Sequence, residues 1–166
     1  ATNTAYGNQT LFKNTTGDRN TAIGHKSLYQ NTEGSHNTAV GYNVLTNTTG
    51  NSNTGIGATA LTDNTTGQYN VALGMNVLRS HTTSHYNTSI GNNSLQDANR
   101  TADTDGYNVA LGYNAGNTGT NDVTTGNKNT LLGSSTAASD AAGTNQTVIG
   151  YGASGQANNS VTLGNA

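Results

Sequence analysis

The stretch NTAIGHKSLYQNTEGSH occupies residues 20–36, and the chain then begins again with NTAVG at residues 37–41. Near-copies of this five-residue motif recur along the sequence, each closing on a glycine. These glycines are Gly7, Gly24, Gly41, Gly57, Gly74, Gly91, Gly112, Gly133, Gly150 and Gly164. Successive glycines lie 14 to 21 residues apart, most often 17. Repetition at a short, nearly fixed period predicts a solenoid, in which each repeat is one coil stabilised by its neighbours.

The repeats cover nearly the whole chain, so we expect residues 1–166 to form one repeat domain of about ten coils. Alternation within the motif predicts one short β-strand per coil, and hence an all-β, parallel β-solenoid. The two 21-residue intervals predict longer loops at residues 96–107 and 117–128. A leucine such as Leu28 follows most motif glycines by four residues. Its segment fits either a second short strand or a single helical turn.

Side-chain size differs between the motif positions. The second position is Thr or Val and the fourth is bulky and mostly aliphatic, as Thr21 and Ile23 illustrate. We expect both to point into the solenoid. The third position is small in the early copies, as at Ala22, and larger at Leu131 and Val148. We therefore expect it to face outward against a second chain, with a contact that tightens toward the C-terminus; the alternative is that a strand surface simply accepts alanine.

Asparagine opens most copies of the motif. The positions are Asn3, Asn20, Asn37, Asn53, Asn70, Asn87, Asn108 and Asn129. Stacked in register, these amides predict a ladder of hydrogen bonds from one coil to the next. NTTG-like segments follow each leucine and predict turns, because Asn and Gly suit turn geometry. These segments start at Asn14, Asn31, Asn47, Asn64 and His81.

The composition is unusual for a compact domain, with 31% hydrophobic and 8% charged residues, no Pro and no Cys. A formal net charge of −2 gives no basic patch, so we expect neither nucleic acid nor an anionic membrane as a partner. No apolar run is long enough to span a bilayer, so membrane insertion by this segment is not expected. The absence of cysteine excludes disulfides and cysteine metal sites.

Titratable side chains are scarce and scattered, and no catalytic motif is present, so we expect a protein that is not an enzyme and that uses no cofactor. His81 and His85 have the spacing of metal ligands on a helix, but His81 lies in an expected turn. The segment DTDGYN at residues 103–108 resembles part of a calcium loop, yet it lacks the closing Glu. We favour ordinary turns and no metal at either place. The sequons at Asn14, Asn47 and Asn64 are also explained by turns.

One column of residues directly precedes the motif. It comprises Arg19, His36, Ser52, Tyr69, Tyr86, Tyr107 and Lys128. In register, Tyr69, Tyr86 and Tyr107 would stack into an exposed aromatic strip with polar tips. Such a strip has two interpretations, a structural ladder or a surface that contacts a ligand. These three tyrosines are the candidate ligand-contact residues.

The repeated NTAIG or NVALG pattern resembles the head repeats of YadA-like trimeric autotransporter adhesins. NSVTLGNA at residues 159–166, with its 14-residue spacing, is the nearest match to the head motif. The longer form, NTAIGHKSLYQNTEGSHNTAVGYNVLTNTTG, resembles repeats of phage tail-fibre and bacterial surface proteins. The resemblance implies a left-handed parallel β-roll whose three chains associate around a common axis. The sequence departs from the shortest repeat of that family in its 17- and 21-residue coils.

These observations together predict a structural and attachment module of an extracellular adhesin or phage tail fibre, located outside the cell or on a virion. Its expected partners are other copies of the chain, in a homotrimer, and a host surface glycan or protein. End-to-end assembly into an extracellular filament is an alternative. An ice-binding solenoid is another, although inward-pointing threonines would count against it. An enzyme on a β-solenoid would need a carboxylate cluster that the sequence does not offer.

Overall fold

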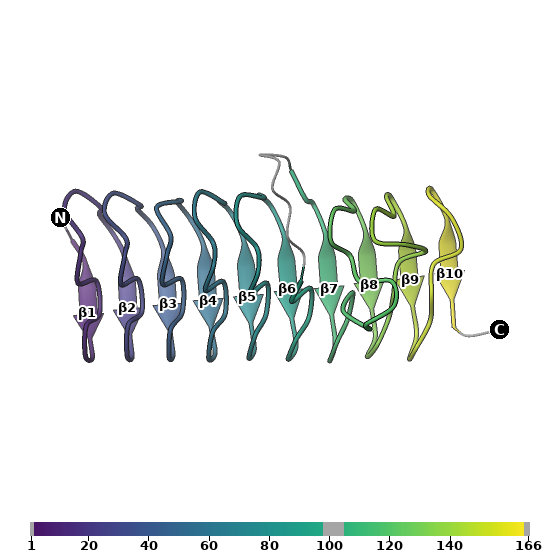
Figure 1. Cartoon of the computed structure of the whole chain (residues 1–166), viewed down its shortest axis with the longest axis horizontal. Coiled ribbons are helices and arrows are strands. Elements are labelled where there is room, and N and C mark those ends of the chain that lie inside the picture. Colours follow the sequence, from purple (N-terminus) through teal and green to yellow (C-terminus); the bar gives the residue numbers. More distant parts are fainter. Residues whose placement is uncertain (1, 98–104, 165–166) are drawn as a thin grey trace.

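The computed structural model describes residues 2–97 and 105–164. Ten three-residue strands lie side by side in sequence order and form a single parallel sheet (Figure 1). The strands are β1 (Thr4–Tyr6), β2 (Thr21–Ile23), β3 (Thr38–Val40), β4 (Thr54–Ile56), β5 (Val71–Leu73), β6 (Thr88–Ile90), β7 (Val109–Leu111), β8 (Thr130–Leu132), β9 (Thr147–Ile149) and β10 (Val161–Leu163). The described residues contain no helix. The predicted all-β parallel solenoid is confirmed.

Consecutive strands pair motif on motif. In β2 and β3, Thr21 lies opposite Thr38, Ala22 opposite Ala39 and Ile23 opposite Val40. The same register holds between β9 and β10, although their coil is only 14 residues long. Changes in repeat length are therefore absorbed outside the strands. Side chains at one motif position form columns that run along the sheet.

The segment that contains the leucine is neither a strand nor a helical turn. In the second coil, Lys26 and Leu28 adopt φ angles of 55° and 53°, in the left-handed region. Such angles cost about 1–2 kcal/mol for a residue other than glycine. Hydrogen bonds to neighbouring coils offset this cost, because the Leu28 N–H donates to Val44 O and the Lys26 N–H to Asn8 O, both at 3.0 Å. Each coil therefore closes through bonds to its neighbours.

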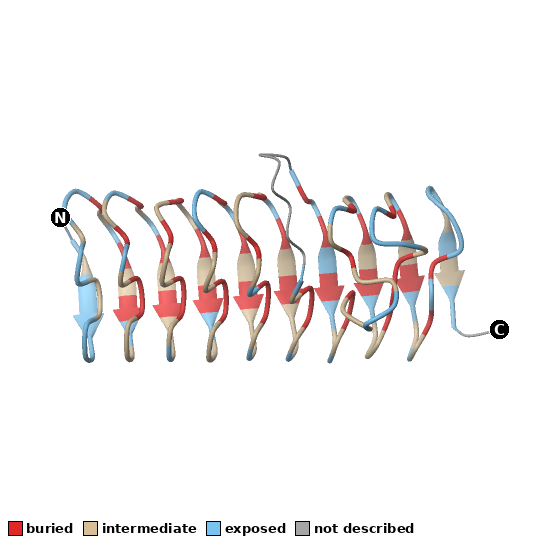
Figure 2. Cartoon of the chain, in the orientation of Figure 1, coloured by how far each residue is buried: buried red, intermediate tan, exposed pale blue. Residues whose placement is uncertain are grey.

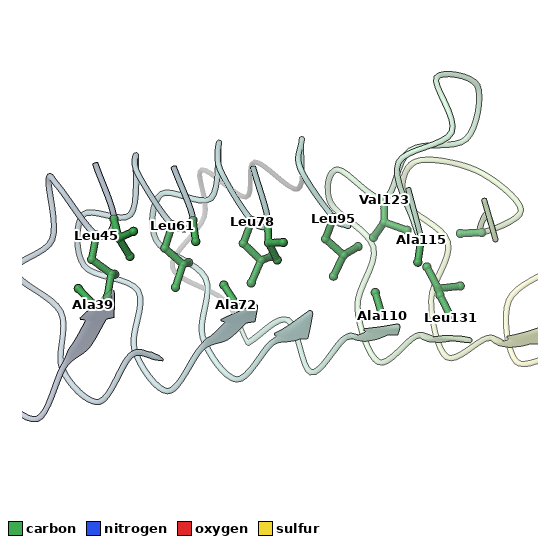
Figure 3. Close-up of a cluster of buried hydrophobic side chains, with 14 of the residues drawn as sticks. Ala39, Leu45, Leu61, Ala72, Leu78, Leu95, Ala110, Ala115, Val123 and Leu131 are labelled. Atoms are coloured by element: carbon green, nitrogen blue, oxygen red, sulfur yellow. The ribbon is translucent and has the colours of Figure 1, made fainter. Parts of the chain in front are cut away.

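The core is a row of leucines that faces the sheet from the opposite wall of the solenoid. Their side chains are fully buried and occupy the same place in successive coils (Figure 3). The row comprises Leu28, Leu45, Leu61, Leu78 and Leu95. Opposite it lie buried strand residues, including Ala22, Ala39, Ala72 and Ala110. The solenoid is thus only two side chains thick, one large and one small.

The predicted orientation of the strands is wrong. Ala22 is fully buried, whereas Ile23 is 38% exposed and Thr21 is partly exposed. The middle of most strands is buried and the flanking positions are not (Figure 2). The third position is small because another surface does approach it closely, but that surface is the chain's own leucine row. Thr and the large aliphatic side chains point outward.

The larger residues at Leu131 and Val148 do not mark a tighter contact with a second chain, because both are fully buried. The leucine row ends at Leu95, and Gly116 takes the equivalent place in the next coil. A Cβ on Gly116 would lie 2.6 Å from Leu95 Cδ2 and 2.9 Å from Leu131 Cδ1. A larger strand residue, Leu131, thus fills the space that Gly116 leaves in the place of a leucine, and the interior stays close-packed.

The leucine row gives a direct test of the core. We expect Leu61→Ala to lower the free energy of unfolding by about 2–5 kcal/mol, because it leaves a cavity among buried neighbours. The matched control is Thr66→Ala, at an exposed position in the same coil, with an expected change of about 0.5 kcal/mol or less. Urea unfolding measures both. Equal losses for the two variants would contradict the assignment of the core.

Candidate functional site

The outer face of the sheet carries a continuous column of large apolar side chains. Five of them, spread from β2 to β9, are between 37% and 42% exposed: Ile23, Ile56, Leu111, Leu132 and Ile149. A second outward column, of Thr and Val, runs parallel to it at the first residue of each strand, and Val109 of that column is 45% exposed. These side chains therefore remain open to solvent from β2 to β9. A long exposed apolar surface on a soluble domain is a mark of an interaction site.

More apolar residues border this face on the side of the motif glycine. Tyr42, Met75 and Tyr113 each follow a motif glycine directly and are between 46% and 55% exposed. The Tyr42 ring stacks on His25 of the preceding coil, with centroids 5.3 Å apart and planes 11° from parallel. The apolar surface therefore continues around the bend at the end of the strands.

The predicted asparagine ladder is confirmed. The Asn37 backbone N–H donates to Asn20 Oδ1 at 2.9 Å, and Asn37 Oδ1 accepts the N–H of Asn53 at 2.9 Å. Asn37 Nδ2 donates to the carbonyl oxygen of Gly50, also at 2.9 Å. Each of these buried amides thus joins three coils. The ladder ends at Gln146, whose Oε1 accepts the Ser139 N–H at 2.9 Å instead of a bond from the next coil.

A second buried polar column follows the leucines, inside the NTTG-like segments that were predicted as turns. Thr48, not Asn47, occupies the place of Asn31 and Asn64, and its Oγ1 accepts a hydrogen bond from Asn64 Nδ2 at 3.0 Å. The cause is the 16-residue coil, which lacks one turn residue between Leu45 and the glycine. Distance from the leucine therefore decides the column, and the letters NTTG do not.

The predicted tyrosine strip does form. The rings of Tyr69 and Tyr86 stack with centroids 5.0 Å apart and planes 2° from parallel, and those of Tyr86 and Tyr107 stack at 5.1 Å and 5°. The three side chains are 42–50% exposed. Because Tyr86 has a ring on each face, the strip presents mainly ring edges and hydroxyl groups. Contact with a ligand stays a prediction, and it would have to use those edges.

The end of the strip is tied to a carboxylate. The Tyr107 hydroxyl donates to Asp105 Oδ2 at 2.9 Å, and this hydrogen bond is the main cause that raises the pKa of Tyr107. Asp105 belongs to the segment at residues 103–108 that resembles part of a calcium loop. Asp103 and Thr104 of that segment lie outside the described residues. The Asp105 carboxylate serves as an acceptor for the phenol.

The two histidines with metal-ligand spacing engage separate backbone partners. His81 is buried, and its Nε2 lies 2.9 Å from the Ser84 carbonyl oxygen, to which it donates. His85 Nδ1 accepts the Gln68 N–H at 3.0 Å. The helix that would align them does not form. Within residues 2–97 and 105–164, no group of three or more His, Cys, Asp or Glu side chains could hold a metal ion.

In the first coil two backbone N–H groups donate to the side chain of Asp18. In the second coil the His36 N–H donates to Asp18 O, but the equivalent Arg19 N–H donates to the side chain of Asp18 at 2.9 Å. The Thr2 N–H donates to the same Asp18 oxygen at 2.6 Å. This bond from Thr2 is the largest of the causes that hold the pKa of Asp18 below its ordinary value.

The outer apolar face was not predicted from the sequence, because those side chains were expected to point inward. A usable signal was present, since the fourth motif position stays large while Leu28 and its equivalents supply a second apolar column. Two large columns and a small one cannot all fill so thin a coil. One large column had to lie outside.

Comparison with protein-family models, with curated proteins and with solved structures finds no match to this chain. The fold and the exposed surfaces therefore have to be interpreted from their own geometry. Among the described residues, no helix has the length and apolar character needed to cross a bilayer.

The asparagine ladder is tested at Asn70, whose Nδ2 donates to Ser84 O at 3.0 Å. We expect Asn70→Asp to destabilise the fold at pH 7, because a buried carboxylate would face that carbonyl. Burial raises the folded-state pKa of this carboxyl above its unfolded value, so the penalty is absent in acid and grows as pH rises. Asn70→Ala should cost about 1–3 kcal/mol with no such pH dependence. Thermal melts at several pH values separate the two, and parallel pH profiles would refute the ladder.

The Asp18 contact predicts acid sensitivity of the first coil. Because the folded pKa of Asp18 lies below its unfolded value, the contact stabilises above the unfolded pKa and is lost as pH falls through the folded pKa. We expect the amide resonances of Thr2 and Arg19 to shift together during acid titration. In Asp18→Asn, which keeps an acceptor oxygen but does not titrate, they should stay fixed. Resonances that move equally in both proteins would rule out this contact.

Proposed function

We propose that the chain is a non-enzymatic structural and attachment module that associates with copies of itself through the outer face of its sheet. The observation that carries the proposal is the column of large aliphatic side chains, of which Ile23, Ile56 and Leu132 are each more than a third exposed, on a face that the described residues leave open. A second copy would remove this surface from water. Each square ångström of apolar surface so buried contributes about 25 cal/mol.

The geometry of the face suits a partner of the same kind. Its columns of Thr or Val and of Ile, Leu or Val repeat from β2 to β10, so an identical solenoid aligned alongside offers matching columns over that length. The likeness of the motif to YadA-like head repeats favours three chains and a left-handed coil. The same likeness favours display on a cell surface or a virion.

An attachment role requires that some surface stays free when the sheet faces meet. The strip of Tyr69, Tyr86 and Tyr107 stands at the other border of the sheet, one position before each strand's asparagine. Phenol hydroxyls and ring edges suit hydrogen bonds and apolar contacts with a host glycan or protein. We place ligand contact there.

Solution mass tests the self-association. Three chains of 16.9 kDa give a particle of about 51 kDa, and light scattering at micromolar protein should find it. We expect Ile56→Asp, which puts a charge on the outer face, to give a folded monomer with an unchanged circular dichroism spectrum. The control Thr66→Asp, away from the sheet, should remain a trimer. A monomeric wild-type chain, or a trimer that tolerates Ile56→Asp, would refute the proposal.

Ice binding is the second candidate, and one observation favours it. The threonines of the motif point outward in a regular column on an open parallel sheet, as Thr21, Thr38 and Thr54 illustrate. The orientation of the threonines therefore does not count against ice binding. Thermal hysteresis at millimolar protein would support this candidate, and its absence would remove it. The interleaved large aliphatic column makes association the stronger proposal.

Filament growth is a further alternative, because the sheet has two edge strands, β1 and β10. The two ends differ, since Ser160 takes the ladder position in the last coil and its Oγ donates to Ala157 O at 2.6 Å. A coil stacked beyond β10 would meet no asparagine there. Discrete short particles in electron micrographs would exclude end-to-end growth.

A further inference from the structure

The tyrosine strip brings together three phenol rings that the sequence separates by 17 and 21 residues. The stacked pairs have centroid distances of 5.0 Å and 5.1 Å, and their planes are within 5° of parallel. Each ring belongs to a different coil, which the sheet register holds in place through β5, β6 and β7. Two tyrosine rings that are stacked and exposed in this way are close enough to couple with each other after oxidation.

We propose that Tyr86 is a site of oxidative cross-linking, at which a carbon–carbon bond to Tyr69 or Tyr107 forms a dityrosine between adjacent coils. The co-reactant is hydrogen peroxide, used by a haem peroxidase. This inference does not depend on the proposed function. It needs only the stacked rings and their exposure of 42–50%.

The reaction balances with one molecule of peroxide. Each of two tyrosines loses one electron and its phenolic proton, which gives two neutral phenoxyl radicals. The radicals join through ring carbons next to the hydroxyl-bearing carbon, and the hydrogen on each joined carbon then moves to the oxygen and restores the phenol. The two electrons and two protons that are removed reduce hydrogen peroxide to two molecules of water.

Asp105 assists the first step at Tyr107. Its Oδ2 already accepts the phenol hydrogen at 2.9 Å, so the proton has an acceptor in place when the ring loses its electron. Coupling then needs only a neighbouring radical, and Tyr86 is the adjacent ring in the stack. The Tyr86–Tyr107 pair is therefore the favoured one, with Tyr69–Tyr86 as the second product.

The bond would connect two neighbouring coils whose strands are separated by one of the long intervals of the sequence. The glycines that close β6 and β7 lie 21 residues apart, as do those that close β7 and β8, whereas most other intervals are 16 or 17 residues. A covalent tie between Tyr86 and Tyr107 would join the coils at the corner of the sheet. We expect the cross-linked protein to melt at a higher temperature than the untreated protein, because the bond restricts the unfolded chain.

The test treats the full chain with horseradish peroxidase and hydrogen peroxide and records dityrosine fluorescence. Trypsin cleavage after Arg79 and Arg100 places the three tyrosines in three different peptides, and Tyr86 is the only tyrosine of its peptide. Fragmentation in the mass spectrometer then identifies the tyrosine joined to it, because the other two peptides hold further tyrosines. We expect a cross-linked peptide pair that contains Tyr86 and has lost two hydrogen atoms, from a protein that still runs as a single chain in denaturing gels.

Variants separate the strip from chance oxidation. Tyr86→Phe should lower the fluorescence to that of untreated protein, because it removes the shared partner of both pairs. Tyr42→Phe is the matched control, since Tyr42 is also exposed but stacks on His25, and it should react like the wild type. Circular dichroism checks that both variants fold. Undiminished dityrosine in folded Tyr86→Phe, or products joined mainly through other tyrosines or between chains, would overturn the proposal.

Discussion

Buried asparagine side chains at the start of the strands hold consecutive coils in register, and the remaining structure depends on that register. Asn70, for example, accepts the N–H of Asn87 and donates to Ser84 O, so one amide satisfies a backbone group of the next coil and one at the end of its own. Left unpaired, those buried groups would each cost a few kcal/mol. A slip by one residue would leave them so, and it would also exchange the buried and exposed faces of every strand. The buried hydrogen bonds therefore require the motif to repeat in the same register in successive coils.

Given that register, a very small apolar core is sufficient. Leu61 and its equivalents meet alanine-sized residues across the solenoid, and the volume is redistributed where the row stops, as Gly116 and Leu131 show. A thin core has no room for the other large side chains of the motif. Ile23 and Ile56 consequently remain on the outside, where they cannot stabilise a single chain. The surplus of exposed aliphatic side chains is the physical reason to expect association.

Because the coils stack in register, residues at the same repeat position lie side by side and form continuous surfaces. Tyr86 alone would be an ordinary exposed tyrosine, whereas in register it forms part of a strip with Tyr69 and Tyr107. Its ring faces are then occupied by neighbouring rings, which restricts how a ligand can approach and favours reaction between the rings. The hydrogen bonds differ between the first and the last described coils. Asp18 caps backbone groups at the first coil, and Gln146 ends the ladder near the last.

The sequence by itself determined the solenoid, the ten strands, their register, the asparagine ladder and the stacked tyrosines. All of these follow from the repeat period, because identical positions must lie beside each other once the coils stack. The sequence did not determine which face of the strands is inside. Period-two alternation is symmetric, so Ala22 and Ile23 exchange roles without changing the pattern. Only the tertiary structure decided this, because the leucine row fills the interior from the opposite wall and leaves room only for small strand residues such as Ala22 opposite it.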